Sequence, residues 1–61
     1  MAMQNYEVRL LKQDGSAALV YMTIGQSDAE VKARLQAISG VTFVRFEIWR
    51  GGLLAACGPA Q

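Results

Sequence analysis

The chain has 61 residues, of which 52% are hydrophobic and 18% are charged, and its formal net charge is +1. A chain of this length forms one small domain, near the lower limit for folding without disulfides or metal ions. Six basic and five acidic residues create no field that by itself would attract nucleic acid or an anionic membrane. We therefore expect a single domain over residues 1–61, with loose ends at 1–4 and 58–61.

The single cysteine, Cys57, bears on the compartment in which the protein works. One cysteine forms no disulfide within the chain, whereas a secreted domain of this size usually has several, so we expect a cytoplasmic location. The first residues lack a basic segment followed by an apolar core, and the longest uncharged stretch, residues 15–27, is too short to span a bilayer. We expect no membrane contact. Without a histidine or cationic partner, Cys57 is interpreted as a small core residue.

Apolar and charged residues alternate from Tyr6 to Leu10, which is the period-two pattern of a half-buried strand. Asp14-Gly15 follows and suits a two-residue type I′ turn, because both central positions of that turn need a positive φ. The sequence therefore predicts a β-hairpin whose second arm runs from Ala17 to Ile24.

The second arm of this hairpin is apolar on both faces, so only the turn fixes its register. If Gln13 pairs with Ser16, the facing pairs are Leu10 with Leu19, Val8 with Tyr21, and Tyr6 with Thr23. The opposite face of the hairpin then carries Leu11, Val20, Met22 and Ile24. A shift of the second arm by one residue, which would turn its apolar set inward, stays open as an alternative.

The segment from Ser27 to Glu30 has the form of a capping box, in which the serine hydroxyl accepts from the Glu30 amide and the Glu30 carboxylate accepts from the serine amide. The apolar face of the helix that begins there consists of Val31, Leu35 and Ile38. The ion pairs expected on its solvent side are Asp28 with Lys32 and Glu30 with Arg34. Gly40 fits the left-handed cap that ends such a helix.

A second period-two segment begins at Thr42. One of its faces carries Val44, Phe46 and Ile48. The other face carries Phe43, Arg45, Glu47 and Trp49. Gly51-Gly52 then turns the chain into a second, shorter hairpin, in which the expected facing pairs are Arg50 with Leu53, Trp49 with Leu54, and Ile48 with Ala55.

These elements give the order β-β-α-β-β and an α+β fold, a four-stranded, mainly antiparallel sheet with one helix packed on one face. The third strand can lie antiparallel beside the first, for the order 2-1-3-4, or parallel beside the second, for the order 1-2-3-4. We favour the first order, because small sheets favour antiparallel pairs. The core between sheet and helix is expected to contain Tyr6, Val8, Leu10, Leu19, Tyr21, Val31, Leu35, Ile38, Val44, Phe46 and Ile48.

The chain combines an Asp-Gly hairpin, a capped helix and a late hairpin of the form E-x-W-x-G-G-L, from Glu47 to Leu53. In this it resembles small bacterial proteins of uncharacterised families. The resemblance covers most of the chain, and its motifs are structural. It implies the β-β-α-β-β fold and transfers no catalytic residue.

The residue types that carry most catalytic chemistry are either missing from the chain or expected to form ion pairs. There is no histidine, which is the commonest general base and metal ligand. Among the five acids, only Glu7 and Glu47 could share a sheet face. Arg9 and Arg45 would lie beside them, so we interpret these residues as cross-strand ion pairs. We expect no enzyme, and we assign no catalytic residue, cofactor or metal ligand.

Nucleic-acid binding is an alternative that the second hairpin raises. Residues of one predicted strand face that could stack on bases and contact phosphates are Phe43, Arg45 and Trp49. Further contacts would be Arg9 and Arg50. Two glutamates on the same face weaken such a patch, and the Gly-aromatic run of RNA-recognition sheets is absent, so we expect no nucleic-acid partner. A single-stranded nucleic-acid-binding protein or an antitoxin-like regulatory protein stays open as the alternative function.

The predicted sheet face away from the helix is rich in large apolar side chains. It carries Leu11, Val20, Met22, Ile24, Phe43, Trp49 and Leu54. Together they make an apolar patch with an area on the order of several hundred Å², which is near or beyond what soluble monomers usually leave exposed. We therefore expect a protein-interaction module that forms a homodimer through this face, or binds another protein there, with Trp49 as an interface anchor.

Overall fold

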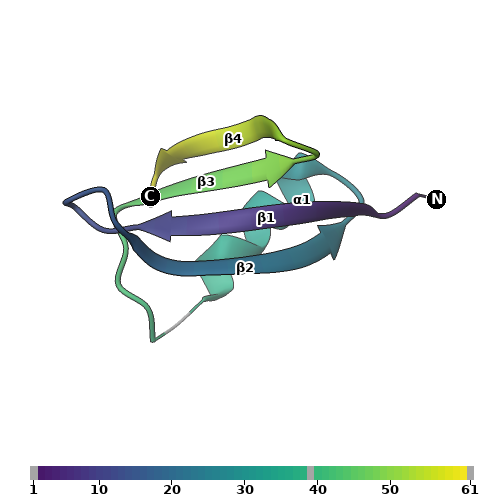
Figure 1. Cartoon of the computed structure of the whole chain (residues 1–61). Helices are drawn as coiled ribbons and strands as arrows, with labels where there is room; N and C mark the ends of the chain where they lie inside the picture. Colours follow the sequence, from purple (N-terminus) through teal and green to yellow (C-terminus); the bar gives the residue numbers. More distant parts are fainter. Residues whose placement is uncertain (1, 39, 61) are drawn as a thin grey trace.

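The computed structural model describes residues 2–38 and 40–60 and contains one sheet and one helical segment (Figure 1). The elements in chain order are β1 (Gln4–Leu11), β2 (Ala17–Gly25), α1 (Asp28–Arg34), the 3-10 turn η1 (Leu35–Ala37), β3 (Arg45–Arg50) and β4 (Leu53–Pro59). The strand order is β2-β1-β3-β4 and every pairing is antiparallel, which confirms the α+β fold and the favoured strand order. We call the face on which α1 lies the helix face and the opposite one the open face.

The turn between β1 and β2 differs from the predicted type I′ turn. Lys12, rather than Gln13, pairs with Ser16, through a 2.8 Å hydrogen bond from the Lys12 amide to the Ser16 carbonyl. Gly15 has a φ of +88°, whereas Asp14 has no positive φ, so the loop is a type I turn that ends in a left-handed glycine. The Asp14 carboxylate accepts from the hydroxyl and the amide of Ser16, and these bonds lower the pKa of Asp14.

The predicted register of this hairpin is nevertheless correct, because a bulge at Ala18 compensates for the longer loop. Ala17 faces Leu11 and Leu19 faces Leu10, so Ala18 has no partner in β1. The three predicted facing pairs are present, namely Leu10 with Leu19, Val8 with Tyr21, and Tyr6 with Thr23. This register excludes the one-residue shift of β2.

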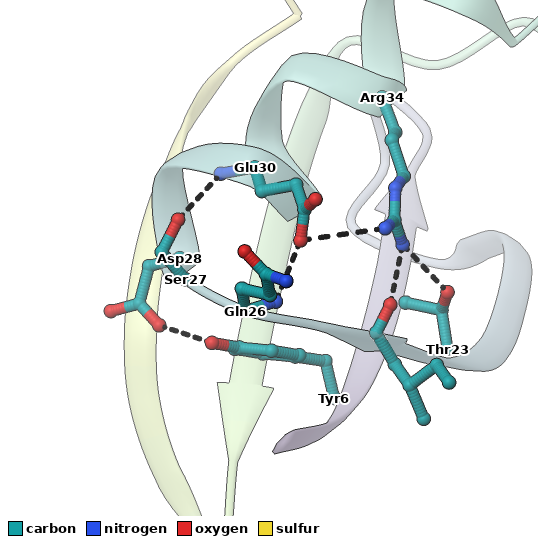
Figure 2. A network of polar contacts seen from close by, with 8 residues as sticks. Tyr6, Thr23, Gln26, Ser27, Asp28, Glu30 and Arg34 are labelled. Carbon is teal, nitrogen blue, oxygen red and sulfur yellow. Dashed lines mark hydrogen bonds and ion pairs between the residues drawn. The ribbon is translucent and has the colours of Figure 1, made fainter. Parts of the chain in front are cut away.

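The helix α1 begins as predicted but ends earlier. Ser27 caps its start, because the Glu30 amide donates to Ser27 Oγ at 3.1 Å. The Glu30 carboxylate accepts at 2.6 Å from the Gln26 amide, not from the Ser27 amide, and it forms the expected ion pair with Arg34 at 3.5 Å (Figure 2). The chain leaves α1 after Arg34 and continues as η1, so the prediction that Gly40 caps the helix is wrong.

The second hairpin contains a bulge that the sequence did not indicate. Gly51 and Gly52 both have positive φ and form the expected turn, with Arg50 facing Leu53 and Trp49 facing Leu54. The expected pair of Ile48 with Ala55 is wrong, because Ile48 faces Ala56 and the extra residue Ala55 has no partner in β3. The strand β3 begins at Arg45 rather than at Thr42, so the predicted alternation does not reach Phe43 and Val44.

The core lies between the helix face and α1. Its buried hydrophobic side chains are Tyr6, Val8, Leu10, Val31, Leu35, Phe46 and Ile48, as expected. Tyr21 and Ile38 are partly buried against this core. The prediction is wrong for Leu19 and Val44, which are 37% and 41% exposed, because β2 is an edge strand and Val44 precedes β3.

Both ends of the sheet extend into the predicted loose ends. Gln4 belongs to β1, and Gly58 and Pro59 belong to β4, while the terminal residues 1 and 61 lie outside the described residues. Cys57 is exposed in β4, which corrects its interpretation as a core residue. Within residues 2–38 and 40–60, no helix is both long enough and apolar enough to cross a membrane.

Candidate interaction surface

An apolar stripe runs along the β2 side of the open face. We define it by Val20, Met22 and Ile24, which alternate with the residues that face the helix and are 50%, 66% and 52% exposed. Across the sheet, Leu54 of β4 is 47% exposed. Four of the seven residues of the predicted apolar patch are therefore well exposed on the open face, and β2 contributes three of them.

The outer edge of β2 is one of the two edges of the sheet (Figure 1). Near its C-terminal end, Arg34 donates from Nη1 to the Ile24 carbonyl at 2.5 Å and to Thr23 Oγ1 at 3.3 Å (Figure 2). Since Arg34 belongs to α1 and not to β1, we infer that the Ile24 carbonyl points to the outer edge. Alternate residues of an antiparallel strand turn their N–H and C=O groups to the same side, so Val20 and Met22 also direct theirs outward.

Paired charges cross the middle of the open face. Arg9 of β1 bonds through Nε to Glu7, and its Nη1 lies 3.9 Å from Oε1 of Glu47 in β3. We call these three residues the charged band. The ion pairing predicted for this face is therefore formed around Arg9, while Arg45 lies exposed at the start of β3.

Trp49 is half-buried beside the charged band. The Arg9 guanidinium lies 5.0 Å from the centroid of the indole ring, and Trp49 Nε1 donates at 3.1 Å to Glu47. A shallow hollow of about 310 Å³ is lined by Trp49, Met22 and the Gly51-Gly52 turn, among others. Trp49 is thus held by contacts within its own chain, and it presents less free surface to a partner than the apolar stripe does.

Phe43 does not lie on the open face, which corrects its place in the predicted patch. It packs against the core and lines the same hollow on the helix side as Leu35 and Gln36. The alternation that predicted its position would require β3 to begin before Arg45. Leu11 is half-buried and belongs to the open face, since it follows the buried Leu10 in β1.

The three arginines considered for nucleic-acid contact do not form one patch. Arg9 belongs to the charged band, and Arg45 lies opposite Leu11 on the same face. Arg50 turns to the other side, where it donates to Asp28 at 2.8 Å. A base-stacking surface combines cations and aromatic rings on one face, and here only Arg9 lies next to Trp49.

On the helix face, Asp28 connects three elements. Its Oδ1 accepts from the Tyr6 hydroxyl of β1 at 2.9 Å (Figure 2) and from Arg50 of β3 at 2.8 Å. The expected ion pair of Asp28 with Lys32 is therefore wrong, and the Lys32 ammonium lies 5.9 Å from the centroid of the Phe46 ring. Burial, together with the bond to Asp28, raises the pKa of the Tyr6 hydroxyl. A buried tyrosine needs a hydrogen-bond partner, which is the signal that could have predicted this contact.

A second hollow, of about 300 Å³, lies on the other side of the molecule and is lined in part by Lys32, Leu35, Phe46 and Cys57. Among residues 2–38 and 40–60, no group of three histidine, cysteine or acidic side chains could hold a metal ion. The open face presents more exposed apolar side chain than this hollow, so it is the candidate functional site.

No protein-family model, curated protein or solved structure matches this chain. The geometry of the open face is therefore the feature of this chain that indicates a function.

Proposed function

We propose that the protein is a small, non-catalytic protein-interaction module that binds a second copy of itself through the open face. The observation that supports this most strongly is the exposure of the apolar stripe, in which each side chain is at least half exposed. Contiguous exposed apolar side chains on a sheet face commonly mark interaction sites. Association would remove it from water, with a gain of about 25 cal/mol for each Å² of apolar surface buried.

The charges on the open face also suit a second copy. Glu7 and Glu47 are balanced by Arg9 and Arg45, so the strands β1 and β3 present no net charge on this face. A strongly charged partner would find no complementary field here, whereas a second copy meets no net repulsion. The exposed thiol of Cys57 is compatible with a reducing cytoplasm as the setting for this role.

Small size gives a further reason for association. The chain has 61 residues, and within residues 2–38 and 40–60 seven hydrophobic side chains are buried in the core. A domain of this length buries a smaller share of its surface than a larger one and has little stability to spare. A shared interface adds buried apolar surface without lengthening the chain.

Analytical ultracentrifugation over about 5 to 500 μM tests the proposal directly. We expect a monomer–dimer equilibrium for the wild type, and a dissociation constant at least about tenfold higher for Met22→Asp, which places a carboxylate in the apolar stripe. Gln13→Asp, which adds the same charge to the exposed first turn, should associate like the wild type. A wild type that sediments as a monomer throughout this range would contradict the proposal.

The separation of the arginines favours self-association over single-stranded nucleic-acid binding. We expect no binding of a single-stranded RNA or DNA of about 20 nucleotides at near-physiological salt, since few phosphate contacts are available. This expectation would be wrong if the nucleic acid showed a salt-dependent mobility shift with the protein and if both Arg45→Ala and Trp49→Ala weakened that shift.

A further inference from the structure

We propose that the second copy joins along the outer edge of β2, so that the two four-stranded sheets become one continuous sheet. This inference rests on the proposed self-association, but it places the contact along the β2 edge of the open face, where the apolar stripe lies, and not across the open face as a whole. It differs from the face-to-face packing that an apolar sheet face alone would suggest, because backbone hydrogen bonds rather than side chains would determine the orientation of the two copies.

The sequence of β2 has few of the features that keep edge strands apart. Residues 17–25 contain no charged residue and no proline, although edge strands of soluble proteins commonly carry lysine or proline for this purpose. The bulge at Ala18 affects only the start of the strand, and Arg34 occupies only the Ile24 carbonyl near its end. The part of the edge between Ala18 and Ile24 is therefore suited to strand addition.

The backbone groups of this segment can pair with those of a second copy. Val20 and Met22 direct their N–H and C=O groups outward, as the bond between Arg34 and the Ile24 carbonyl indicates. In an antiparallel arrangement with Val20 opposite Met22 of the second copy, these residues exchange about four backbone hydrogen bonds across a twofold axis at Tyr21. On the open face, the two apolar stripes then lie side by side and cover part of each other.

The other edge of the sheet is a poorer partner for β2. The strand β4 has a bulge at Ala55, and Pro59 near its end lacks an N–H donor. Pairing of β2 with β4 of another copy would leave an unpaired sheet edge at each end of the assembly, so further copies could add without limit. Pairing of β2 with β2 uses the same edge in both copies and gives a closed dimer. A second copy joined through its own β2 is therefore the occupant that the edge favours.

The size of this contact predicts a weak dimer. Pairing of one short strand segment and three side chains buries less than the roughly 800 Å² per partner that is typical of stable complexes. We expect a dissociation constant on the order of 10 to 100 μM. Association at this level would be visible in solution and would depend on the concentration of the protein.

Val20→Pro and Leu54→Lys distinguish edge pairing from face-to-face packing. Proline at position 20 removes an outward N–H that the fold of one copy does not use, so the domain should fold while dimerisation is lost, with at least a tenfold increase in the dissociation constant. Leu54, at 47% exposed, is nearly as exposed as Val20, at 50%, but it lies in β4, so Leu54→Lys should leave the dimer intact. Circular dichroism checks that each variant folds. Sedimentation velocity over the concentration range used for the wild type measures association.

If Val20→Pro does not fold, Met22→Lys takes its place, since it keeps every backbone N–H and adds a charge to the edge. Amide hydrogen exchange in the wild type gives an independent measurement, because Val20 and Met22 should become protected only at high concentration. Edge pairing is wrong if the dimer persists in the β2 variant and is lost in Leu54→Lys, or if it is lost equally in both. Self-association itself would still hold in either case. A wild type that stays monomeric overturns both.

Discussion

The Tyr6 hydroxyl of β1 donates a 2.9 Å hydrogen bond to the Asp28 carboxylate at the start of α1. Tyr6 is fully buried whereas Asp28 is partly exposed, so this bond lies at the margin of the core. The same carboxylate oxygen accepts from Arg50 of β3. One acidic side chain therefore links the start of the helix to the two central strands.

Replacing Tyr6 by phenylalanine removes this bond and leaves the buried ring in place. We expect Tyr6→Phe to lower the melting temperature by about 5 °C, because a lost hydrogen bond counts heavily in a domain of this size. Tyr21→Phe is the matched control, since Tyr21 is only half-buried and no bond to its hydroxyl is found among the described residues. Thermal unfolding followed by circular dichroism measures both, and equal melting temperatures for the two variants would argue against a stabilising role for the Asp28 contact.

Alkaline pH should destabilise the fold through the tyrosines. The pKa values of Tyr6 and Tyr21 are both raised from the ordinary value of 10.0, chiefly by burial. The unfolded chain therefore loses these protons at a lower pH than the folded chain. The stability that the neutral tyrosines contribute is complete below about pH 10 and is lost as the pH rises through the folded pKa values.

Urea unfolding at several pH values above about 9 tests this dependence. We expect the free energy of unfolding to fall more steeply with pH in the wild type than in Tyr6→Phe or Tyr21→Phe, because each variant lacks one of the two titrating groups. Parallel pH profiles for all three proteins would show that neither tyrosine contributes to the alkaline loss.

Gly25, the last residue of β2, has no room for a side chain. A Cβ atom there would lie 2.7 Å from Cγ2 of Val31 and 3.1 Å from a carboxylate oxygen of Glu30. Val31 is buried and β-branched in a helix, so its rotamer has little freedom to adjust. We expect Gly25→Ala to lower the free energy of unfolding by about 1 to 3 kcal/mol in a urea titration.

Gly58→Ala is the control for that substitution. Its Cβ would meet the Phe46 ring at 3.6 Å, which is an ordinary van der Waals distance. This variant should unfold close to the wild-type midpoint. Similar losses in Gly25→Ala and Gly58→Ala would show that the cost comes from replacing a strand glycine and not from the contact with Val31.

Trp49 is the only tryptophan, so its fluorescence reports on the open face. We expect Arg9→Ala to shift the emission to longer wavelengths, because removal of the guanidinium lets water reach the indole ring. The melting temperature should change little, since partly exposed ion pairs contribute at most about 1 kcal/mol. Arg45→Ala should leave the emission unchanged, and a spectrum of Arg9→Ala that matches the wild type would mean that Arg9 does not shield the ring.

Most of the fold could be predicted from the sequence because local signals mark where its elements begin and end. Alternation identified β1, the Ser27 cap identified α1, and Gly51-Gly52 identified the second turn. The bulges at Ala18 and Ala55 could not be predicted, since a small apolar residue fits a regular ladder as well as a bulge. In the first hairpin the bulge also offset the error in the turn, so the register was correct although the predicted turn type was wrong.

The candidate surface was predictable to the extent that it depends on strand alternation. Met22 and its neighbours in the apolar stripe follow from the register of β2, and they are exposed as expected. Phe43 was misplaced, because it precedes β3 and alternation holds only within a strand. The bond from Arg34 to Ile24 depends on how α1 sits across the sheet, which periodicity along the chain does not specify.

The strand order has a consequence for folding kinetics. β1 pairs with β2 and β3 pairs with β4 across short turns, whereas β1 and β3 are separated in the chain by β2 and the helical segment. Short loops close at a lower entropic cost than long ones, so each hairpin should form early and the pairing of β1 with β3 should limit the rate. The folding rate would then be most sensitive to substitutions where β1 pairs with β3, for example at Val8 and Ile48, and less sensitive to substitutions in either turn.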